Sequence, residues 1–477
     1  MVTSRVSQSH RESLLVLSDV HLGSDLNDHP QPEGFGKRSV KVDRDLVRMI
    51  DHYRRTKPRG DRWRIVFAGD FIDFIGIAIL PKDHALATEP SVEEREHGLG
   101  NAADHAIEKM RRVGARHADV FAAIAAFLAE GNAMTVVHGN HDVELHWEEV
   151  QNEMRAIIAM HAPVNEEEDV ARRIDFAPLF FWAEGVAYIE HGHQYDAMCA
   201  NEHPMLPVSP LDPRRIARGF CDVLLRFVVR PTRGLREHGH EKMGIFGYLA
   251  FGMALGVRGL LGLGVAFARA VIEMFRLRRE WIGDAAKKIR REHRRRVVRF
   301  ARARQIQLRR LDALFALQER PVIQSIRGIL GSVLLDRLAL GLAAIMVLAV
   351  VGAFAVHHYT LWFAAAAVIA AWAIGHRWLA KQRKIDPDDQ LKERAAHLAT
   401  LFPAAFVVMG HTHVPLELPI ADGARYINVG SWSEEEDQGD AAYRAARTHL
   451  VIHVEEGTPV AEFLTWESEI GPKRFGA

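Results

Sequence analysis

The chain has 477 residues, of which 48% are hydrophobic, enough for two or three domains with sizeable cores. Lys and Arg together number 61, as do Asp and Glu, so the formal net charge is zero. This excludes a strongly acidic or basic protein, and the net charge does not indicate a binding partner. The two cysteines, Cys199 and Cys221, exclude a disulfide-stabilised scaffold and favour a reducing compartment. We expect no signal peptide, because residues 1–12 are polar and the apolar run 14–17 is too short.

The first part of the chain predicts buried strands that each end in polar residues. The predicted strands are 13–19, 64–68 and 134–138. The predicted helices are 42–54, 101–130 with a break near Gly114, and 144–160. The strands lead into Asp19-Val20-His21, Gly69-Asp70-Phe71-Ile72-Asp73 and Gly139-Asn140-His141-Asp142. Because open α/β sheets place their ligands at the carboxyl ends of their strands, we expect these polar residues to lie together.

The sheet continues in the second part of the chain, but with a long interruption. The further predicted strands are 174–176, 179–182, 186–190, 405–409, 425–429 and 449–454. Two of them lead into His191-Gly192-His193 and Gly410-His411-Thr412-His413. Four prolines between 204 and 213 mark a boundary. We therefore predict a catalytic domain, 1–200 and 389–477, that is split by a helical insertion at 201–388.

The polar residues after the strands form a set typical of a metal site. Its seven members are Asp19, His21, Asp70, Asn140, His191, His411 and His413. Seven ligands exceed what one cation usually takes from a protein, so they suit two divalent cations that share one carboxylate. Carboxylate, imidazole and amide ligands admit Mn, Fe, Zn, Co or Ni, of which manganese is our first expectation.

The order Asp-x-His, Gly-Asp-x-x-Asp, Gly-Asn-His-Asp, His-Gly-His, Gly-His-x-His resembles the calcineurin-like metallophosphoesterase superfamily over 14–196 and 405–432. The resemblance implies an α/β fold, a two-sheet αββα sandwich, here interrupted by the helical insertion. It also implies two cations and a bridging hydroxide that attacks phosphorus. One cation would be held by Asp19, His21, Asp70 and His413. The other would be held by Asp70, Asn140, His191 and His411.

Other residues of the motifs are not cation ligands in this interpretation. By resemblance, His141 lies beside the leaving group as general acid or charge stabiliser, and Asp73 orients it. The alternative is that both only support Asn140 and Asp70. His193 either contacts the phosphate or flanks His191. We expect Asp142 to cap the following helix, and residues 428–432 to support the backbone near the site.

Two departures narrow the subfamily. Phe74 stands where protein Ser/Thr phosphatases of this superfamily carry an arginine. The sequences around Asp19, His191 and His411 look more like the UDP-2,3-diacylglucosamine pyrophosphatase branch, which cleaves a nucleotide–lipid pyrophosphate at the inner membrane face. That branch usually has arginine at the position of His141. We therefore expect a lipid-linked or small phosphorylated substrate.

The insertion predicts contact with a membrane. Residues 338–356 and 360–376 form two uncharged or nearly uncharged runs that are long enough for a transmembrane hairpin. Cationic residues flank the hairpin on both sides: Arg327, Arg337, Arg377, Lys381, Arg383 and Lys384. Positive charge favours the cytoplasmic side, so we expect a catalytic domain at the cytoplasmic face of the inner membrane. The apolar segment 244–275 could be interfacial, re-entrant or packed on the hairpin.

The segment 276–310 has fifteen Lys or Arg and three acids, a local net charge of +12. Its pattern predicts a basic amphipathic helix that would be attracted to anionic lipid headgroups. A solvated or oligomer-forming helix is an alternative, and so is a nucleic-acid surface, which we favour less. The function hypotheses are therefore a membrane-anchored two-metal phosphohydrolase, a metal-dependent nuclease or phosphodiesterase, and a non-catalytic membrane scaffold. The sequence does not indicate an oligomeric state.

Overall fold

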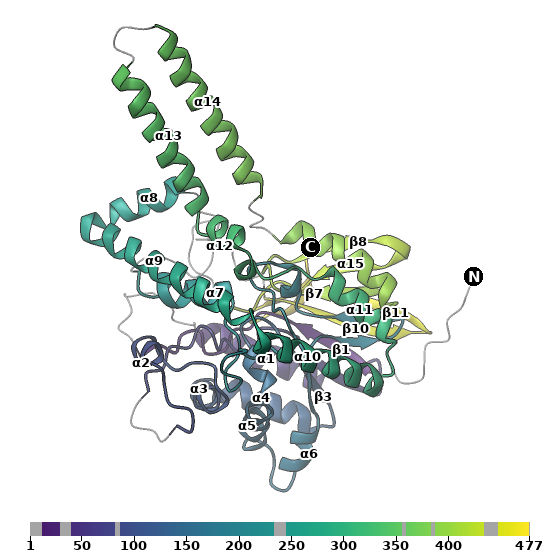
Figure 1. Ribbon diagram of the computed structural model, residues 1–477. Coiled ribbons are helices and arrows are strands. Elements are labelled where there is room, and N and C mark those ends of the chain that lie inside the picture. Colours follow the sequence, from purple (N-terminus) through teal and green to yellow (C-terminus); the bar gives the residue numbers. More distant parts are fainter. Residues whose placement is uncertain are drawn as a thin grey trace. The chain divides into compact units, whose positions relative to one another are not determined.

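The structure is a computed structural model that describes residues 12–28, 40–81, 86–232, 245–354, 359–382, 387–433 and 447–476. The chain forms two compact units (Figure 1). The first unit comprises Met1–Ala217, Asp284–Glu319 and Asp388–Ala477. The second unit comprises Arg218–Gly283 and Arg320–Pro387. The protein is a mixed α/β protein with two sheets, which confirms this part of the predicted fold.

Both sheets belong to the first unit. The seven-stranded sheet has the order β12 (Gly471–Arg474), β11 (Thr458–Glu467), β10 (Thr448–Glu455), β1 (Glu12–Leu17), β2 (Arg62–Ala68), β3 (Ala133–Val137), β4 (Ile174–Ala177). The five-stranded sheet has the order β5 (Phe181–Ala183), β6 (Ala187–Ile189), β7 (Phe406–Met409), β9 (Arg425–Asn428), β8 (Leu416–Pro419). Strands β1 to β4 are parallel, as are β6, β7 and β9. In each parallel set the carboxyl ends therefore meet at one edge.

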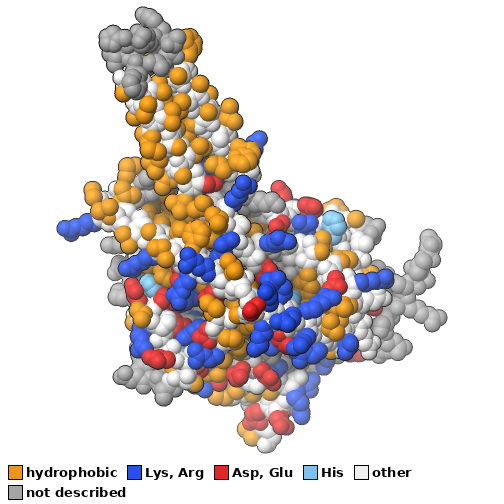
Figure 2. Space-filling view, viewed as in Figure 1, with side chains coloured by type: hydrophobic (Ala, Val, Ile, Leu, Met, Phe, Trp, Pro, Cys, Tyr) orange, Lys and Arg blue, Asp and Glu red, His pale blue; other side chains and the backbone are white. Residues whose placement is uncertain are grey.

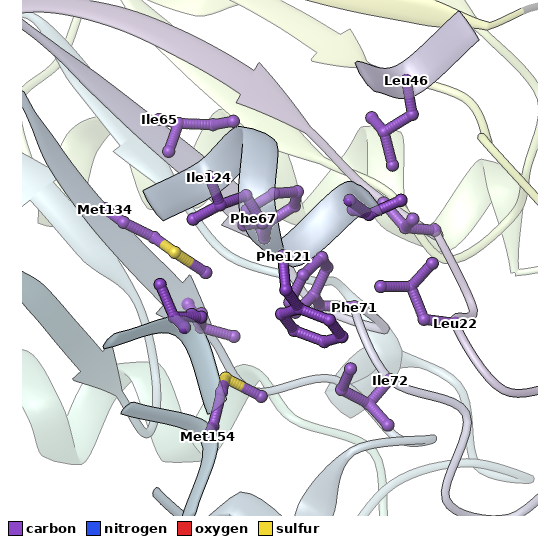
Figure 3. Packing of buried hydrophobic residues seen from close by; sticks show 14 of the residues in the cluster. Leu22, Leu46, Ile65, Phe67, Phe71, Ile72, Phe121, Ile124, Met134 and Met154 are labelled. Carbon is purple, nitrogen blue, oxygen red and sulfur yellow. The ribbon is translucent and has the colours of Figure 1, made fainter. Parts of the chain in front are cut away.

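The central strands are buried on both faces, which explains their nearly continuous apolar sequences. In β2, Ile65 and Phe67 join a hydrophobic cluster with the surrounding helices, whereas Val66 and Ala68 join the cluster between the two sheets. Figure 3 shows the helix-side cluster, where Phe67 and Phe71 are stacked with ring centroids 4.0 Å apart. The alternation fixes the register of the strand that ends at the candidate site.

Helices cover the outer face of each sheet in the first unit. Those in the helix-side cluster of the larger sheet are α1 (Val40–Arg55), α3 (Ala103–Arg116), α4 (Ala118–Ala129), α5 (Glu148–Ala159) and α6 (Glu167–Arg172). The helices beside the smaller sheet are α10 (Asp284–Ala303), α11 (Leu308–Leu317) and α15 (Asp388–Leu401). A further short helix, α2, spans Val92–His97.

The predicted helix 101–130 is divided near Gly114, as expected. The break falls at His117, between α3 and α4, where φ is −114°. The imidazole of His117 is buried, lies 2.7 Å from Asp43 through Nδ1, and accepts a hydrogen bond from the backbone of Gly23 at 3.0 Å. The break thus brings a polar side chain of the helical layer to the loop that follows β1.

The basic helix α10 belongs to the first unit, although it lies inside the predicted insertion 201–388. Ala286, Ile289, Val297 and Ala301 are buried, and Val297 and Ala301 share a cluster with residues of α15 and β7. The amphipathic pattern indicated a buried face but not its partner. The predicted insertion is therefore divided between the two units.

The second unit is helical in its described part. Its elements are α7 (Phe220–Leu224), the π-helical turn η3 (Leu225–Val229), α8 (Ile245–Ala254), α9 (Gly256–Glu280), η5 (Val322–Gln324), α12 (Ile326–Ser332), α13 (Leu335–Phe354) and α14 (Tyr359–Gln382). Helices α13 and α14 pack side by side (Figure 1). By length and composition, two segments could cross a membrane, Leu335–Ala353 and Trp362–Gln382. Residues 355–358, at the turn of the predicted hairpin, and 383–386 lie outside the described residues.

Candidate metal centre

All seven predicted ligands lie in the first unit, just after β1, β2, β3, β6 and β7. Five of them have a left-handed backbone: φ is 52° at Asp19, His21 and Asp70, 70° at His411 and 60° at His413. This conformation is costly for residues other than glycine, and such strain concentrates at functional sites. The sharp turns allow the side chains of the motifs to converge.

One group consists of Asp19, His21 and His413. Asp19 Oδ1 lies 3.1 Å from His413 Nε2 and 3.8 Å from His21 Nε2. This oxygen is buried. A buried carboxylate oxygen that two imidazole nitrogens approach is an arrangement that a shared divalent cation would stabilise.

Asp70 connects the groups. Its Oδ2 lies 3.1 Å from His191 Nε2 and 3.7 Å from His21 Nε2, and Asn140 Oδ1 lies 3.1 Å from the same His191 nitrogen. Its Oδ1 accepts a hydrogen bond from the His141 backbone at 2.8 Å. The three residues Asp19, Asp70 and His191 form a further group with ligand atoms close together. Asp70 therefore belongs to two of the groups of potential ligands.

His411 stands apart from the rest of its predicted set. Its ring centroid is 5.2 Å from that of His191, but its Nε2 lies 3.1 Å from Asp196 Oδ2. His411, Asp196 and Cys199 form a separate group of potential ligands. Asp196 is not among the predicted site residues because no motif contains it. The only available signal was its position in the loop that also carries His191.

His141 and Asp73 form a close pair. Asp73 Oδ1 lies 2.7 Å from His141 Nδ1 and also accepts a hydrogen bond from the Gly76 backbone at 2.7 Å. His141 additionally forms a group of potential ligands with His21 and Asp70. The contacts agree with an oriented general acid and also with support for the metal ligands, the two roles left open by the sequence.

His193 and Asp142 are placed differently. His193 is buried beside His191 and His411, with ring centroids 5.3 and 6.5 Å away, and it belongs to none of the potential ligand groups formed by the described residues. The prediction that Asp142 caps the next helix is wrong. Its carboxylate instead accepts hydrogen bonds from the backbones of Gly139 and Phe71, at 2.6 and 2.8 Å, because the loop after β3 must fold against Asp70.

The loop after β3 requires glycine at position 139 because its backbone lies very close to Asp70. A Cβ atom at Gly139 would lie 2.0 Å from Asp70 Oδ1 and 2.5 Å from the Asp70 nitrogen.

Residues 428–432 bind the backbone of two site loops. Asn428 donates to the carbonyl of Gly410 at 2.7 Å, and Ser431 donates to the carbonyl of Asp19 at 3.1 Å. The predicted backbone-supporting role of residues 428–432 is confirmed.

Burial and neighbouring charges set the protonation of the site. Burial would raise the pKa of Asp19 and Asp70, but nearby imidazoles reverse this effect and both pKa values lie well below the ordinary range. His413 and His191 act on Asp19, and His191 and His141 act on Asp70. Burial opposes charge on His191 too, yet the two carboxylates raise its pKa to about 9. The aspartates are thus ionised, as cation ligands must be, whereas His191 would release a proton when it binds a cation.

Comparisons with known proteins do not identify a family. The chain matches no protein-family model and no curated protein sequence. The assignment of function therefore depends on the motifs and on the geometry of the site.

Proposed function

We propose that the first unit is a two-metal phosphohydrolase of the calcineurin-like metallophosphoesterase type, with the αββα sandwich of that superfamily. The observation that carries the proposal is the convergence of Asp19, His21, Asp70, His191 and His413 from four strand ends and two sheets. The set contains carboxylates and imidazoles, which hold borderline divalent cations. Chance turns would not bring buried, strained acidic and imidazole side chains to one point.

In this proposal Asp19, His21 and His413 hold one cation, and Asn140, His191 and His411 hold the other, with Asp70 shared. Bound divalent cations would supply a nucleophile at neutral pH and compensate the charge that develops at phosphorus. Asp70 also fixes the backbone of His141 through its second oxygen. Loss of this one carboxylate would therefore disturb both cations and the residue beside the leaving group.

His141 would act on the leaving group. Asp73 Oδ1 lies 2.7 Å from Nδ1 of its ring and would orient it so that Nε2 donates a proton or a hydrogen bond to the departing oxygen. The pKa of Asp73 is lowered by His141 even though burial opposes this, so Asp73 is an ionised partner. The pair would orient the ring and stabilise its protonated form.

The second unit would attach the enzyme to a membrane, with the first unit on the cytoplasmic side. Of the 25 strongly exposed large hydrophobic side chains in the described part of the chain, 18 lie in the second unit and 7 in the first. In the apolar windows of α13 and α14 only 6% and 0% of residues are buried. Figure 2 shows the surface of these helices dominated by hydrophobic side chains. Helices of a soluble core would be buried, so lipid is the favoured partner.

Helix α9 would lie in the membrane interface. One face buries Leu263, Ala270, Met274 and Leu277 within the second unit. The residues of its exposed apolar stripe are Val257, Leu261, Val265 and Ile272. Exposed arginines adjoin the stripe at 258, 269, 276 and 279. An apolar stripe with flanking arginines is typical of an interfacial helix, which favours this alternative over a re-entrant segment for 244–275.

Helix α10 would add electrostatic attraction. Its apolar face is buried in the first unit, so it is not available for insertion into lipid. Exposed cations of α10 include Lys287, Lys288, Arg290, Arg291 and Arg302. Figure 2 shows Lys and Arg gathered over this part of the first unit. Anionic headgroups would bind this surface in a salt-dependent way, and a lipid-linked phosphoryl group is the substrate class that such a location favours.

The test is hydrolysis by the full-length protein in detergent or lipid, with Mn²⁺ added. The panel would contain phosphomonoesters, phosphodiesters, nucleotides and lipid-linked pyrophosphates. We expect chelator-sensitive turnover that is highest on a lipid-linked or small phosphorylated compound. Salt-sensitive cleavage of DNA or RNA would instead support the nuclease alternative, for which the exposed cations of α10 are the favouring observation. Bound metal without turnover on the whole panel would support the scaffold.

A further inference from the structure

The imidazole of His411 is held by a carboxylate that lies outside the five motifs. Asp196 Oδ2 is 3.1 Å from His411 Nε2, while the backbone of His411 donates to Asp19 Oδ2 at 3.0 Å. The side chains of His411 and Asp196 are 8% and 15% exposed, so water competes little for this contact. His411 is thus fixed from two sides, by a proposed ligand and by Asp196.

Asp196 is itself rigidly placed at the end of the short 3₁₀ turn η2 (His193–Tyr195). Its Oδ1 accepts a hydrogen bond from the Met198 backbone at 2.8 Å. Its carbonyl accepts from the backbones of Cys199 and Ala200 at 3.0 and 2.8 Å. One carboxylate oxygen therefore fixes the side chain to its own loop, and the other faces His411.

The two ring nitrogens of a neutral imidazole have opposite roles, one as donor and one as acceptor. In His191, Nδ1 lies 2.9 Å from the carbonyl of Ala68, which can only accept, so Nε2 is the nitrogen left for a cation. In His411 the roles of the two ring nitrogens are exchanged. The ionised form of Asp196 would accept from Nε2–H, which leaves Nδ1 as the coordinating nitrogen.

We infer that Asp196 is a positioning residue of the second cation site. It holds His411 with Nε2 protonated and thereby presents Nδ1 as the ligand atom. A carboxylate behind a ligating histidine fixes its tautomer and raises its basicity. The inference rests on the proposed two-metal function. The competing possibility is that Asp196, Cys199 and His411 together form a ligand group of their own, because their potential ligand atoms also lie close together.

The experiment is a Mn²⁺ titration of the full-length protein by calorimetry, with the metal content after dialysis measured by elemental analysis. We expect two equivalents in the unmodified chain. In Asp196→Asn, the amide oxygen can still accept from Nε2–H but the charge is lost, so the second equivalent should bind roughly 10–100-fold more weakly. Asp196→Ala should lose at least as much. The first equivalent should bind as before in both variants, which also reports that they are folded.

Cys199→Ser is the matched variant in the same loop, and we expect it to bind both equivalents normally. Unchanged second-site affinity in Asp196→Ala would overturn the inference while leaving the two-metal function intact. An equal loss in Cys199→Ser would also overturn it, because it would indicate direct ligation by the cluster. If the unmodified chain takes up no Mn²⁺ and no other divalent ion, the proposed function itself is wrong.

Discussion

The two units depart from the usual pattern of burial in opposite directions. In the first unit, ionisable side chains lie inside: Asp19, Asp70 and His191 are 0%, 2% and 1% exposed. In the second unit, large apolar side chains lie outside: Met346 and Phe363 are 65% and 78% exposed. An uncompensated buried carboxylate costs several kcal/mol, and exposed apolar surface forgoes roughly 25 cal/mol per Å². Each departure indicates the kind of molecule that would stabilise it, cations for the first unit and lipid for the second.

The proposed catalysis and the proposed membrane attachment depend on different units of the chain. The buried polar site depends on strand ends and strained turns, and the exposed helices depend on length and composition. Substitutions at distant sites without shared partners usually act independently. A change in one unit should therefore alter catalysis without membrane attachment, or the reverse, and the predictions below use that independence.

The largest effect is expected at Asp70. Asp70→Ala should remove the shared ligand of both cations, so turnover should fall by more than the roughly 10²–10⁴-fold that loss of a general acid produces. Metal content should fall as well, whereas membrane attachment should remain. The measurements are elemental analysis, turnover and membrane fractionation. Glu184→Ala, an exposed carboxylate of the same unit, is the control and should behave as the unmodified chain. Chelator-resistant turnover in Asp70→Ala would contradict the two-metal site.

A smaller loss, with the metals retained, is expected at His141. His141→Gln and Asp73→Asn should lower turnover about 10²–10⁴-fold on substrates whose leaving group needs a proton. The loss should be much smaller for a nitrophenyl leaving group, which departs as a stable anion. Turnover on both substrates is measured together with metal content, and the exposed His161→Gln is the control. Equal losses on both substrates with reduced metal content would instead assign the pair to ligand support.

The membrane side of the comparison is tested with a single charge. Met346→Arg on α13 should cost about 2.5–3.5 kcal/mol of insertion free energy, because arginine is unfavourable at the centre of a transmembrane helix. Its matched control is Val164→Arg, since Val164 is 82% exposed in the first unit and should tolerate charge within about 0.5 kcal/mol. Membrane fractionation of the two full-length variants measures the difference. If Met346→Arg stays fully attached and active like the control, α13 does not span lipid.

Much of the first unit could be predicted because local sequence and tertiary role agree there. The strands that end at the site are apolar on both faces and have Gly, Asp or His within the next two residues, so the apolar pattern and the residues that end it indicate the same elements. Strands β8, β11 and β12 were missed. In β11 most residues are only partly buried, so the sequence lacks the continuous apolar run that marks the central strands.

What the sequence could not provide is contact between segments that no motif joins. Asp196 meets His411 across 215 positions, and nothing near either residue indicates this. Asp142 is a conventional capping residue in a plausible position, yet it binds two backbone groups of the metal-site loops. The amphipathic pattern of α10 required a buried face, but both a membrane and a protein core satisfy that pattern. These cases were decided by tertiary contacts.

The smallest effect concerns a buried polar group that is not one of the proposed metal ligands. His449 is fully buried, with Nε2 2.7 Å from the hydroxyl of Tyr53, and burial lowers its pKa to about 3. Unfolding would restore a pKa near 6.5, so between these values the unfolded chain binds more protons. The stabilisation is present above pH 6.5 and is lost as pH falls, by up to about 1.4 kcal/mol per pH unit.

The prediction is that His449→Gln flattens this dependence. Glutamine keeps a polar partner for Tyr53 but does not titrate, so between pH 6.5 and 5 the variant should lose up to about 2 kcal/mol less stability than the unmodified chain. Denaturant unfolding of both proteins across this range measures the difference, with the exposed His161→Gln as control. Metal content should be unchanged in His449→Gln. An identical pH slope in the two proteins would mean that His449 gains no proton on unfolding. The loss of stability at low pH would then be caused by other histidines. Burial of a polar side chain would also not be enough to distinguish the metal site from the rest of the core.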